Sequence, residues 1–168
     1  LPNPNVPPLL LAVDPEYFAE GLPYIPDDYC PVDGVVHAIR GLVNGIKTNP
    51  LRAFVVSVLQ RRDVFDCFWA MQASSRDHHS FQGGLALHSM EAAADLASQG
   101  TLTDLERDLG TAGALLHDIG KIWSYTEDMF PNAAGLGMGH ELVGLCRLEP
   151  QLLKLEQAWP DGAYVMRS

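Results

Sequence analysis

Apolar residues recur every three or four positions along most of this chain, and this periodicity most restricts the folds that it can adopt. The clearest run follows Val32, and its apolar positions are Val35, Val36, Ile39, Leu42, Val43 and Ile46. Such spacing places apolar side chains on one face of an α-helix. The alternation typical of β-strands is not found, nor is an internal repeat. The sequence therefore predicts an all-α helical bundle.

Capping residues predict where these helices begin. Asp33 is expected to cap the first helix, and Asn49 followed by Pro50 suits the start of the second. Thr103 with Glu106 matches the capping box, in which each side chain hydrogen-bonds the backbone of the other residue. We expect helices over residues 33–46, 49–59, 63–71, 85–98 and 103–117.

Glycine and proline predict the boundaries nearer the carboxyl end. Gly135, Gly137 and Gly139 indicate a mobile loop, because closely spaced glycines leave the backbone free. Pro150 interrupts the pattern that follows, since proline lacks the N–H group that an interior helical position needs. We therefore expect two short helices there, over residues 141–147 and 151–159.

The first 31 residues differ in composition from the rest of the chain. They hold eight of the twelve prolines, and proline blocks regular helix. Their apolar residues, among them Leu9 to Val13, are too numerous for a solvated linker. We expect residues 1–31 to form an irregular, proline-rich arm that packs on a helical domain of residues 32–168.

The composition restricts the partners and the compartment. A formal net charge of −10 repels a polyanion on average, although metal ions or other domains of a larger parent chain could supply positive charge. No apolar stretch approaches the roughly 20 residues that cross a bilayer, so no membrane partner is expected. Cys30, Cys67 and Cys146 are odd in number and widely spaced, which favours a reducing cytoplasm over a disulfide framework. The first residues carry no targeting signal, and the sequence looks like a fragment.

A histidine–aspartate pair, His117-Asp118, closes the fifth predicted helix. Imidazole and carboxylate together suit divalent ions, and two carboxylate oxygens can bridge a pair of ions. His88 lies on the preceding helix, so two antiparallel helices could present His88 and His117 to one ion. His140 could reach a second ion, and Lys121 could offset the charge of a phosphate oxygen in the transition state.

Four segments resemble the HD superfamily of metal-dependent phosphohydrolases. Residues 83–89, Gly-Gly-Leu-Ala-Leu-His-Ser, and 117–121, His-Asp-Ile-Gly-Lys, are similar to the stretches that carry that family's metal-ligating histidine and His-Asp pair. Residues 78–84, His-His-Ser-Phe-Gln-Gly-Gly, look like a stretch of YhaM-type exoribonucleases and of the TraI-type HD domains of MOBH conjugative relaxases. The segment 21–26, Gly-Leu-Pro-Tyr-Ile-Pro, is more similar to the TraI-type arrangement.

The resemblance implies an HD-domain helical bundle that hydrolyses phosphate esters with one or two divalent ions, such as manganese, magnesium or iron. The implied metal ligands are His88, His117, Asp118 and His140, the implied catalytic residues are Asp118 and Lys121, and the implied substrate contacts are His78, His79 and Lys121. A metal ion lowers the pKa of its bound water, so no serine or cysteine nucleophile is required. The implied substrate is a nucleic-acid phosphodiester, of DNA rather than RNA, in a relaxase-like protein of conjugation.

The resemblance also predicts a missing ligand. HD enzymes usually complete the first metal site with an aspartate on a later helix. Asp161 is the one late aspartate here, and its neighbours Pro160 and Gly162 favour a turn over a ligand-bearing helix. We therefore expect the domain to be truncated at its carboxyl end, with the last ligand beyond residue 168.

Simpler alternatives exist for each assignment. His117 and Lys121 would also suit a helix end, where cations stabilise the helix dipole, and His88 could be a core histidine. His78 and His79 could cap their loop instead of lining a substrate cleft. Two other functions stay open: a non-catalytic docking or regulatory scaffold, and a small-nucleotide phosphohydrolase, which needs no basic track.

Overall fold

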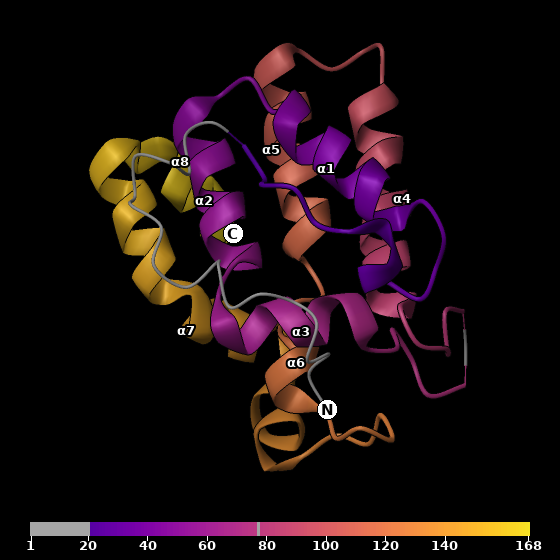
Figure 1. The fold of residues 1–168 in the computed structure, drawn as a ribbon. Coiled ribbons are helices and arrows are strands. Elements are labelled where there is room, and N and C mark those ends of the chain that lie inside the picture. The colour runs from indigo at the N-terminus through magenta and orange to yellow at the C-terminus, as the bar shows by residue number, and fades with distance from the viewer. Residues whose placement is uncertain (1–20, 77) are drawn as a thin grey trace.

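The computed structural model describes residues 21–76 and 78–168, and these residues form a bundle of helices with no β-strand beyond one isolated bridge (Figure 1). The elements are the 3₁₀-helix η2 (Asp27–Tyr29), α1 (Val35–Gly45), α2 (Asn49–Leu59), α3 (Arg62–Ala70), α4 (Gly84–Ser98), α5 (Asp104–Leu116), α6 (Lys121–Ser124), α7 (Ala133–Ala158) and α8 (Pro160–Arg167). The predicted all-α class is confirmed. In this part of the chain, no helix has both the length and the apolar character that a membrane span requires.

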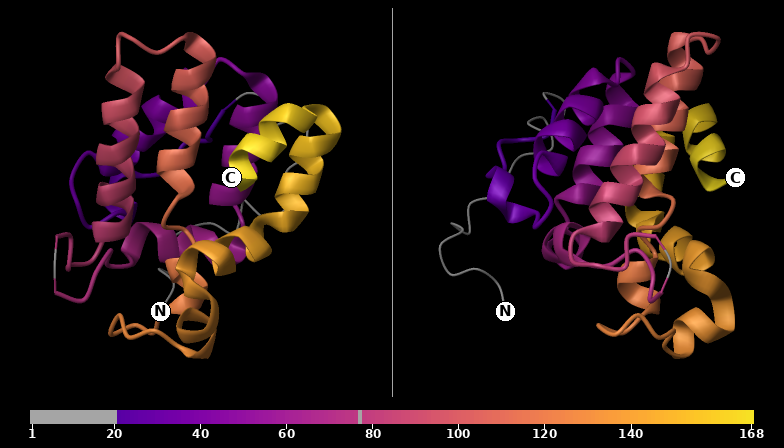
Figure 2. Two further views of the ribbon diagram at one scale, coloured as in Figure 1. Left: turned by 180° about the vertical axis from the view of Figure 1, so that it is seen from behind. Right: turned by 90° about the vertical axis from the view of Figure 1, so that its right-hand side faces the viewer.

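The helices α4 and α5 lie side by side and antiparallel, as Figure 1 and the left view of Figure 2 show. The helix α3 crosses below α4 and contacts it, and the short helix α6 packs against both α3 and α7. From there α7 passes along α2, and α8 turns back to contact α5. The ends of α4 and α5 that lie nearest α3 carry the candidate site.

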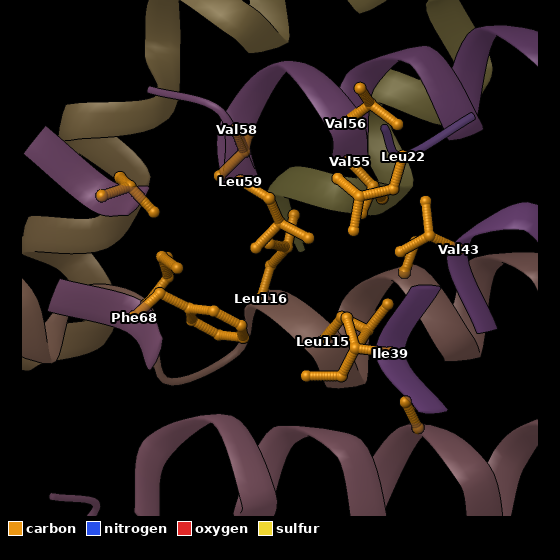
Figure 3. Packing of buried hydrophobic residues seen from close by; sticks show 14 of the residues in the cluster. Leu22, Ile39, Val43, Val55, Val56, Val58, Leu59, Phe68, Leu115 and Leu116 are labelled. Atoms are coloured by element: carbon orange, nitrogen blue, oxygen red, sulfur yellow. The ribbon is translucent and has the colours of Figure 1, made fainter. Parts of the chain in front are cut away.

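The core lies where α1, α2, α3 and α5 converge (Figure 3). Ile39 of α1, Val55 of α2, Phe68 of α3 and Leu115 of α5 are each fully buried in this cluster. Burying one such side chain stabilises a fold by about 1.5–3 kcal/mol. The apolar faces predicted from the periodicity are therefore the faces that meet.

The capping box of α5 is confirmed. The Thr103 hydroxyl oxygen accepts from the Glu106 N–H at 3.3 Å, and the Glu106 carboxylate accepts from the Thr103 N–H at 2.8 Å. The predicted cap of α1 is wrong, because Gly34 and not Asp33 occupies the N-cap. Gly34 has a φ of +77°, a left-handed conformation that glycine adopts without strain.

The predicted cap of α2 is wrong by one residue, since Thr48 precedes the helix and Asn49 begins it. The Thr48 backbone N–H and its hydroxyl both donate to Oδ2 of Asp108 at 2.7 Å. Asp108 lies 60 positions away on α5 and is buried. The start of α2 is thus held by a contact between distant parts of the chain.

The predicted glycine loop is also wrong, because Gly135 and Gly137 are residues of α7. Only Gly139 leaves helical geometry, with φ 76° and ψ 156°, and the helix kinks there. Asn132 caps α7, and its side chain accepts from two backbone N–H groups of the first turn at 3.0 and 3.1 Å. A Cβ at Gly135 would meet the Ser124 carbonyl of α6 far inside van der Waals contact, so close helix packing explains this glycine.

The predicted break at Pro150 is wrong as well, since α7 continues through it to Ala158. A proline inside a helix costs about 3 kcal/mol. Leu148, Leu152 and Leu155 are buried by the same helix, and their burial offsets that cost.

The predicted turn around Asp161 is replaced by α8, which begins at Pro160. Proline suits a first helical position because its missing N–H would have no partner there. Asp161 lies exposed in this first turn.

Of the predicted arm, residues 1–20 with Leu9 to Val13 lie outside the described residues. In the remainder, Leu22, Ile25 and Cys30 are buried, and the Leu22 N–H donates to Oδ1 of Asn44 on α1 at 2.9 Å. Residues 21–31 therefore pack on the helical body, whereas the division of the whole chain into an arm and a domain stays a prediction.

Candidate metal centre

Two neighbouring helices bring three metal-ligating side chains together. His88 lies on α4, and His117 and Asp118 directly follow α5. Donor atoms from the three residues all lie within 4.8 Å of one another. Nε2 of His88 is 3.2 Å from Nε2 of His117, and Oδ2 of Asp118 lies 3.5 Å from the first of these nitrogens and 3.4 Å from the second. We call this group the metal centre below.

The backbone orients His117. Its Nδ1 lies 2.8 Å from the carbonyl oxygen of Ala114, one turn earlier. A carbonyl oxygen can only accept, so Nδ1 carries the proton in this contact and Nε2 of the neutral ring keeps its lone pair. That lone pair belongs to the nitrogen nearest His88 and Asp118, as metal ligation requires.

Both oxygens of Asp118 are in use. Lys121 donates from Nζ to Oδ2 at 2.7 Å, and also to the carbonyl oxygen of Ala73 at 2.8 Å. Nε2 of His140 lies 2.9 Å from Oδ1. His140 therefore contacts the carboxylate oxygen Oδ1, whereas His88 and His117 lie nearest to Oδ2. Lys121 contacts Asp118 and a backbone carbonyl within the protein.

Gly120 explains how His140 comes so close. A Cβ at this position would meet the carbonyl oxygen of His140 and the N–H nitrogen of Gly144 far inside van der Waals contact. The turn after Asp118 and the helix α7 can thus touch only if residue 120 has no side chain. This packing role of Gly120 was not predicted from the sequence.

The loop before α4 brings one of its two histidines to the site. Nε2 of His79 lies 2.9 Å from a carboxylate oxygen of Glu91, and the His79 ring centroid lies 5.4 Å from that of His88. His78 is exposed. His79 has a φ of +63°, and a Cβ at Gly84 would clash with its carbonyl oxygen, so Gly84 allows this loop to fold onto α4.

Glu91 was not anticipated from the sequence. It lies three residues after His88 on α4, and side chains at that spacing share one face of a helix. That spacing was the available signal. Asp161, in contrast, is not part of the metal centre.

The charges of the metal centre are strongly coupled. Burial raises the pKa of Asp118, but the neighbouring His117 and Lys121 outweigh it and hold the pKa well below its usual range. The carboxylate of Asp118 in turn raises the pKa of His117, and burial lowers the pKa of His88. The site thus holds an ionised carboxylate beside a histidine that favours its neutral, metal-ligating form.

This donor set fits a divalent ion. Two imidazole nitrogens and a carboxylate leave coordination positions open for water and substrate, as metal sites of hydrolases do. The approach of two Nε2 atoms beside a carboxylate is also an arrangement that one shared cation would stabilise.

Compared with protein-family models, with curated proteins and with solved structures, the chain shows no significant match in any of the three. The resemblance to the HD superfamily therefore stays a prediction.

Proposed function

We propose that this protein is a divalent-metal-dependent phosphohydrolase of the HD type. The observation that carries the proposal is the metal centre, in which donor atoms of His88, His117 and Asp118 lie within 4.8 Å of one another. The motifs that resemble the HD superfamily are the motifs that supply these three residues.

In this proposal His88, His117 and Asp118 hold one divalent ion, and His140 stands at the other oxygen of Asp118, where a second ion would find a ligand. A bound ion supplies a water of lowered pKa and polarises a phosphoryl oxygen. Lys121 keeps Asp118 ionised and in place, and the Ala114 carbonyl keeps the His117 ring oriented. Lys121 is then a positioning residue for the metal ligand more than a phosphate contact.

Two observations bear on the identity of the substrate, and they favour different esters. The resemblance to relaxases favours a DNA phosphodiester, with further domains of a larger chain as partners. The charge favours a small ester, because a formal net charge of −10 repels a polyanion on average. Parallel assays of an oligonucleotide, a nucleotide and a simple chromogenic ester separate these substrates.

A non-catalytic scaffold is the second candidate. It is favoured by the position of Asp161, which lies exposed on α8 and outside the metal centre, so the ligand expected from a late helix is not supplied by this aspartate. Metal binding without turnover of any ester would favour the scaffold over the enzyme.

The test of the proposal is metal binding beside turnover. We expect wild-type protein to bind Mn²⁺ in calorimetry and to hydrolyse a chromogenic phosphate ester, and Asp118→Asn to lose turnover and weaken metal binding by about tenfold or more. Asp161→Asn is the matched control, since it makes the same change at an exposed position outside the metal centre and should behave as wild type. Unchanged metal affinity in Asp118→Asn would refute the assigned site.

A further inference from the structure

A groove of about 740 Å³ lies between α5 on one side and α7 and α8 on the other. The left view of Figure 2 shows the arrangement of these three helices. Small-molecule sites commonly enclose about 300–1,000 Å³. Leu116, Leu148 and Leu152 line the groove as buried residues. Leu142 and Val165 also line it but stay 47% and 50% exposed. We call it the α5–α8 groove.

The groove reaches the metal centre. His117 belongs to its lining, and so does Glu141, whose carboxylate lies 3.4 Å from Nε2 of His140. His117 is thus the one residue of the metal centre that lines the groove, and a molecule bound at both places would pass this histidine.

The side chains that line the α5–α8 groove indicate which kind of ligand group it could bind. His117, Glu141, Arg167 and Ser168 are its polar members, and Arg167 is already paired with two glutamates of α7. All other lining side chains are hydrocarbon or thioether, apart from glycines on α5 and α7. The hydrogen-bonding groups of a nucleobase would stay largely unpaired against such walls, which weakens binding. An aliphatic chain has no hydrogen-bonding groups, so it does not incur this cost.

We propose that the α5–α8 groove binds the aliphatic group of a small phosphate monoester, the phosphate of which lies at the metal centre. This inference rests on the proposed phosphohydrolase function and adds the substrate class. Hydrolysis breaks the P–O bond to the aliphatic alcohol and forms a P–O bond to the water oxygen. One water proton leaves with the alcohol, the other stays on the released phosphate, and the products balance without another reactant.

The test measures binding of non-hydrolysable n-alkylphosphonates, from methyl to octyl, in the presence of Mn²⁺. Burying each additional methylene should tighten binding roughly fourfold until the groove is filled. Calorimetry of the wild-type protein reads this directly, independent of turnover.

Gly113→Leu is the blocking variant. Gly113 lines the groove on α5, a Cβ there meets nothing within 4 Å, and leucine is a better helix former than glycine. We expect Gly113→Leu to bind methylphosphonate as the wild type does and to lose the gain with chain length. Gly41→Leu is the matched control, because Gly41 lies on α1 with equally open space, in the lining of a different groove. It should keep the wild-type dependence on chain length.

If Gly113→Leu does not fold by circular dichroism, Leu142→Asp places a charge on the half-exposed wall and should give the same loss. The assignment is overturned if wild-type affinity does not rise with chain length, if the blocking variants leave the rise intact, or if Gly41→Leu removes it. Tighter binding of a nucleoside monophosphate than of octylphosphonate also overturns it. Failure to bind Mn²⁺ refutes the proposed function and this inference together, whereas Mn²⁺ binding without dependence on chain length refutes the groove alone.

Discussion

At the scale of single residues, Asp118 organises the candidate site. Its side chain is buried, and its two oxygens contact residues from α4, α6 and α7 as well as the adjacent His117. A carboxylate in this position is stable only because cationic and hydrogen-bonding partners surround it. Its partners are therefore part of the site even where they touch no substrate.

Gly120→Ala tests the close approach that places His140 beside Asp118. The added methyl group would collide with the backbone of α7, so we expect a loss of about 1–3 kcal/mol in the free energy of unfolding, as for other overpacked sites. Urea denaturation measures it. Gly113→Ala makes the same change in open space inside α5, and there we expect no loss or a gain of up to about 1 kcal/mol. Equal stabilities of the two variants would contradict the packing described here.

At the scale of helices, an arginine clamp joins the junction of α2 and α3 to α6 and α7. Arg61 donates two hydrogen bonds to Asp63 at 2.9 and 2.8 Å and one to Gln151 of α7 at 3.0 Å. Its guanidinium lies 5.3 Å from the ring centroid of Trp123 on α6, and the Trp123 N–H donates to Asp63. The clamp thus sets where α6 and α7 lie, and with them Lys121 and His140.

The clamp predicts a pH dependence of stability. The hydrogen bonds from Arg61 hold the pKa of Asp63 below its usual value. The folded state therefore binds a proton at Asp63 less readily than the unfolded state does. The contribution of the Asp63 carboxylate to the free energy of unfolding is complete above about pH 4, near the pKa of the unfolded chain. This contribution is lost as the pH falls through the pKa of the folded state. We expect Asp63→Asn to cost about 0.5 kcal/mol at neutral pH, because the pair is partly exposed, and less in acid.

Urea denaturation of the wild type and of Asp63→Asn between pH 7 and about pH 3 measures how the difference in their free energies of unfolding changes with pH. The control is the same substitution in an Arg61→Gln background, where the cost and its pH dependence should both shrink. A difference that grows in acid would contradict the stated sign.

At the scale of the whole molecule, the metal centre joins two helices that both contribute side chains to the core. Its three residues lie on α4 and directly after α5, and these helices pack side by side. An ion bound there links them only in the folded state, since the unfolded chain does not hold these residues together.

Metal should therefore stabilise the fold. With Mn²⁺ at about 100 times its Kd, we expect the free energy of unfolding to rise by about 2.7 kcal/mol, and a chelator should reverse the rise. Thermal unfolding with and without Mn²⁺ measures it, with Asp118→Asn as the variant that should show little response. A midpoint of thermal unfolding of the wild type that does not change with Mn²⁺ would contradict the assigned metal centre.

Local signals in the sequence anticipated a large part of this molecule. The helical periodicity around Ile39 predicted an apolar face that the structure buries, and the Thr103–Glu106 capping box predicted the start of α5. The motif residues His88, His117 and Asp118 were expected to meet, and the structure brings them together, although ligation itself stays a prediction. These features depend on residues within one or two helical turns, or on two neighbouring helices, so their spacing along the chain carries the information.

Contacts between distant segments decided the rest. Pro150 stays helical because its helix buries three leucines, and Gly135 is helical because α6 packs against it, although local rules predict a break and a loop. The Arg61 clamp and the contact of Lys121 with Asp118 and Ala73 likewise join residues that only the folded chain brings together. The sequence by itself determined the all-α class, the apolar faces of the helices between residues 35 and 116, and which residues could ligate a metal. Only the tertiary structure decided where those helices end and what each charged side chain faces, because long-range packing outweighs local preferences of a few kcal/mol.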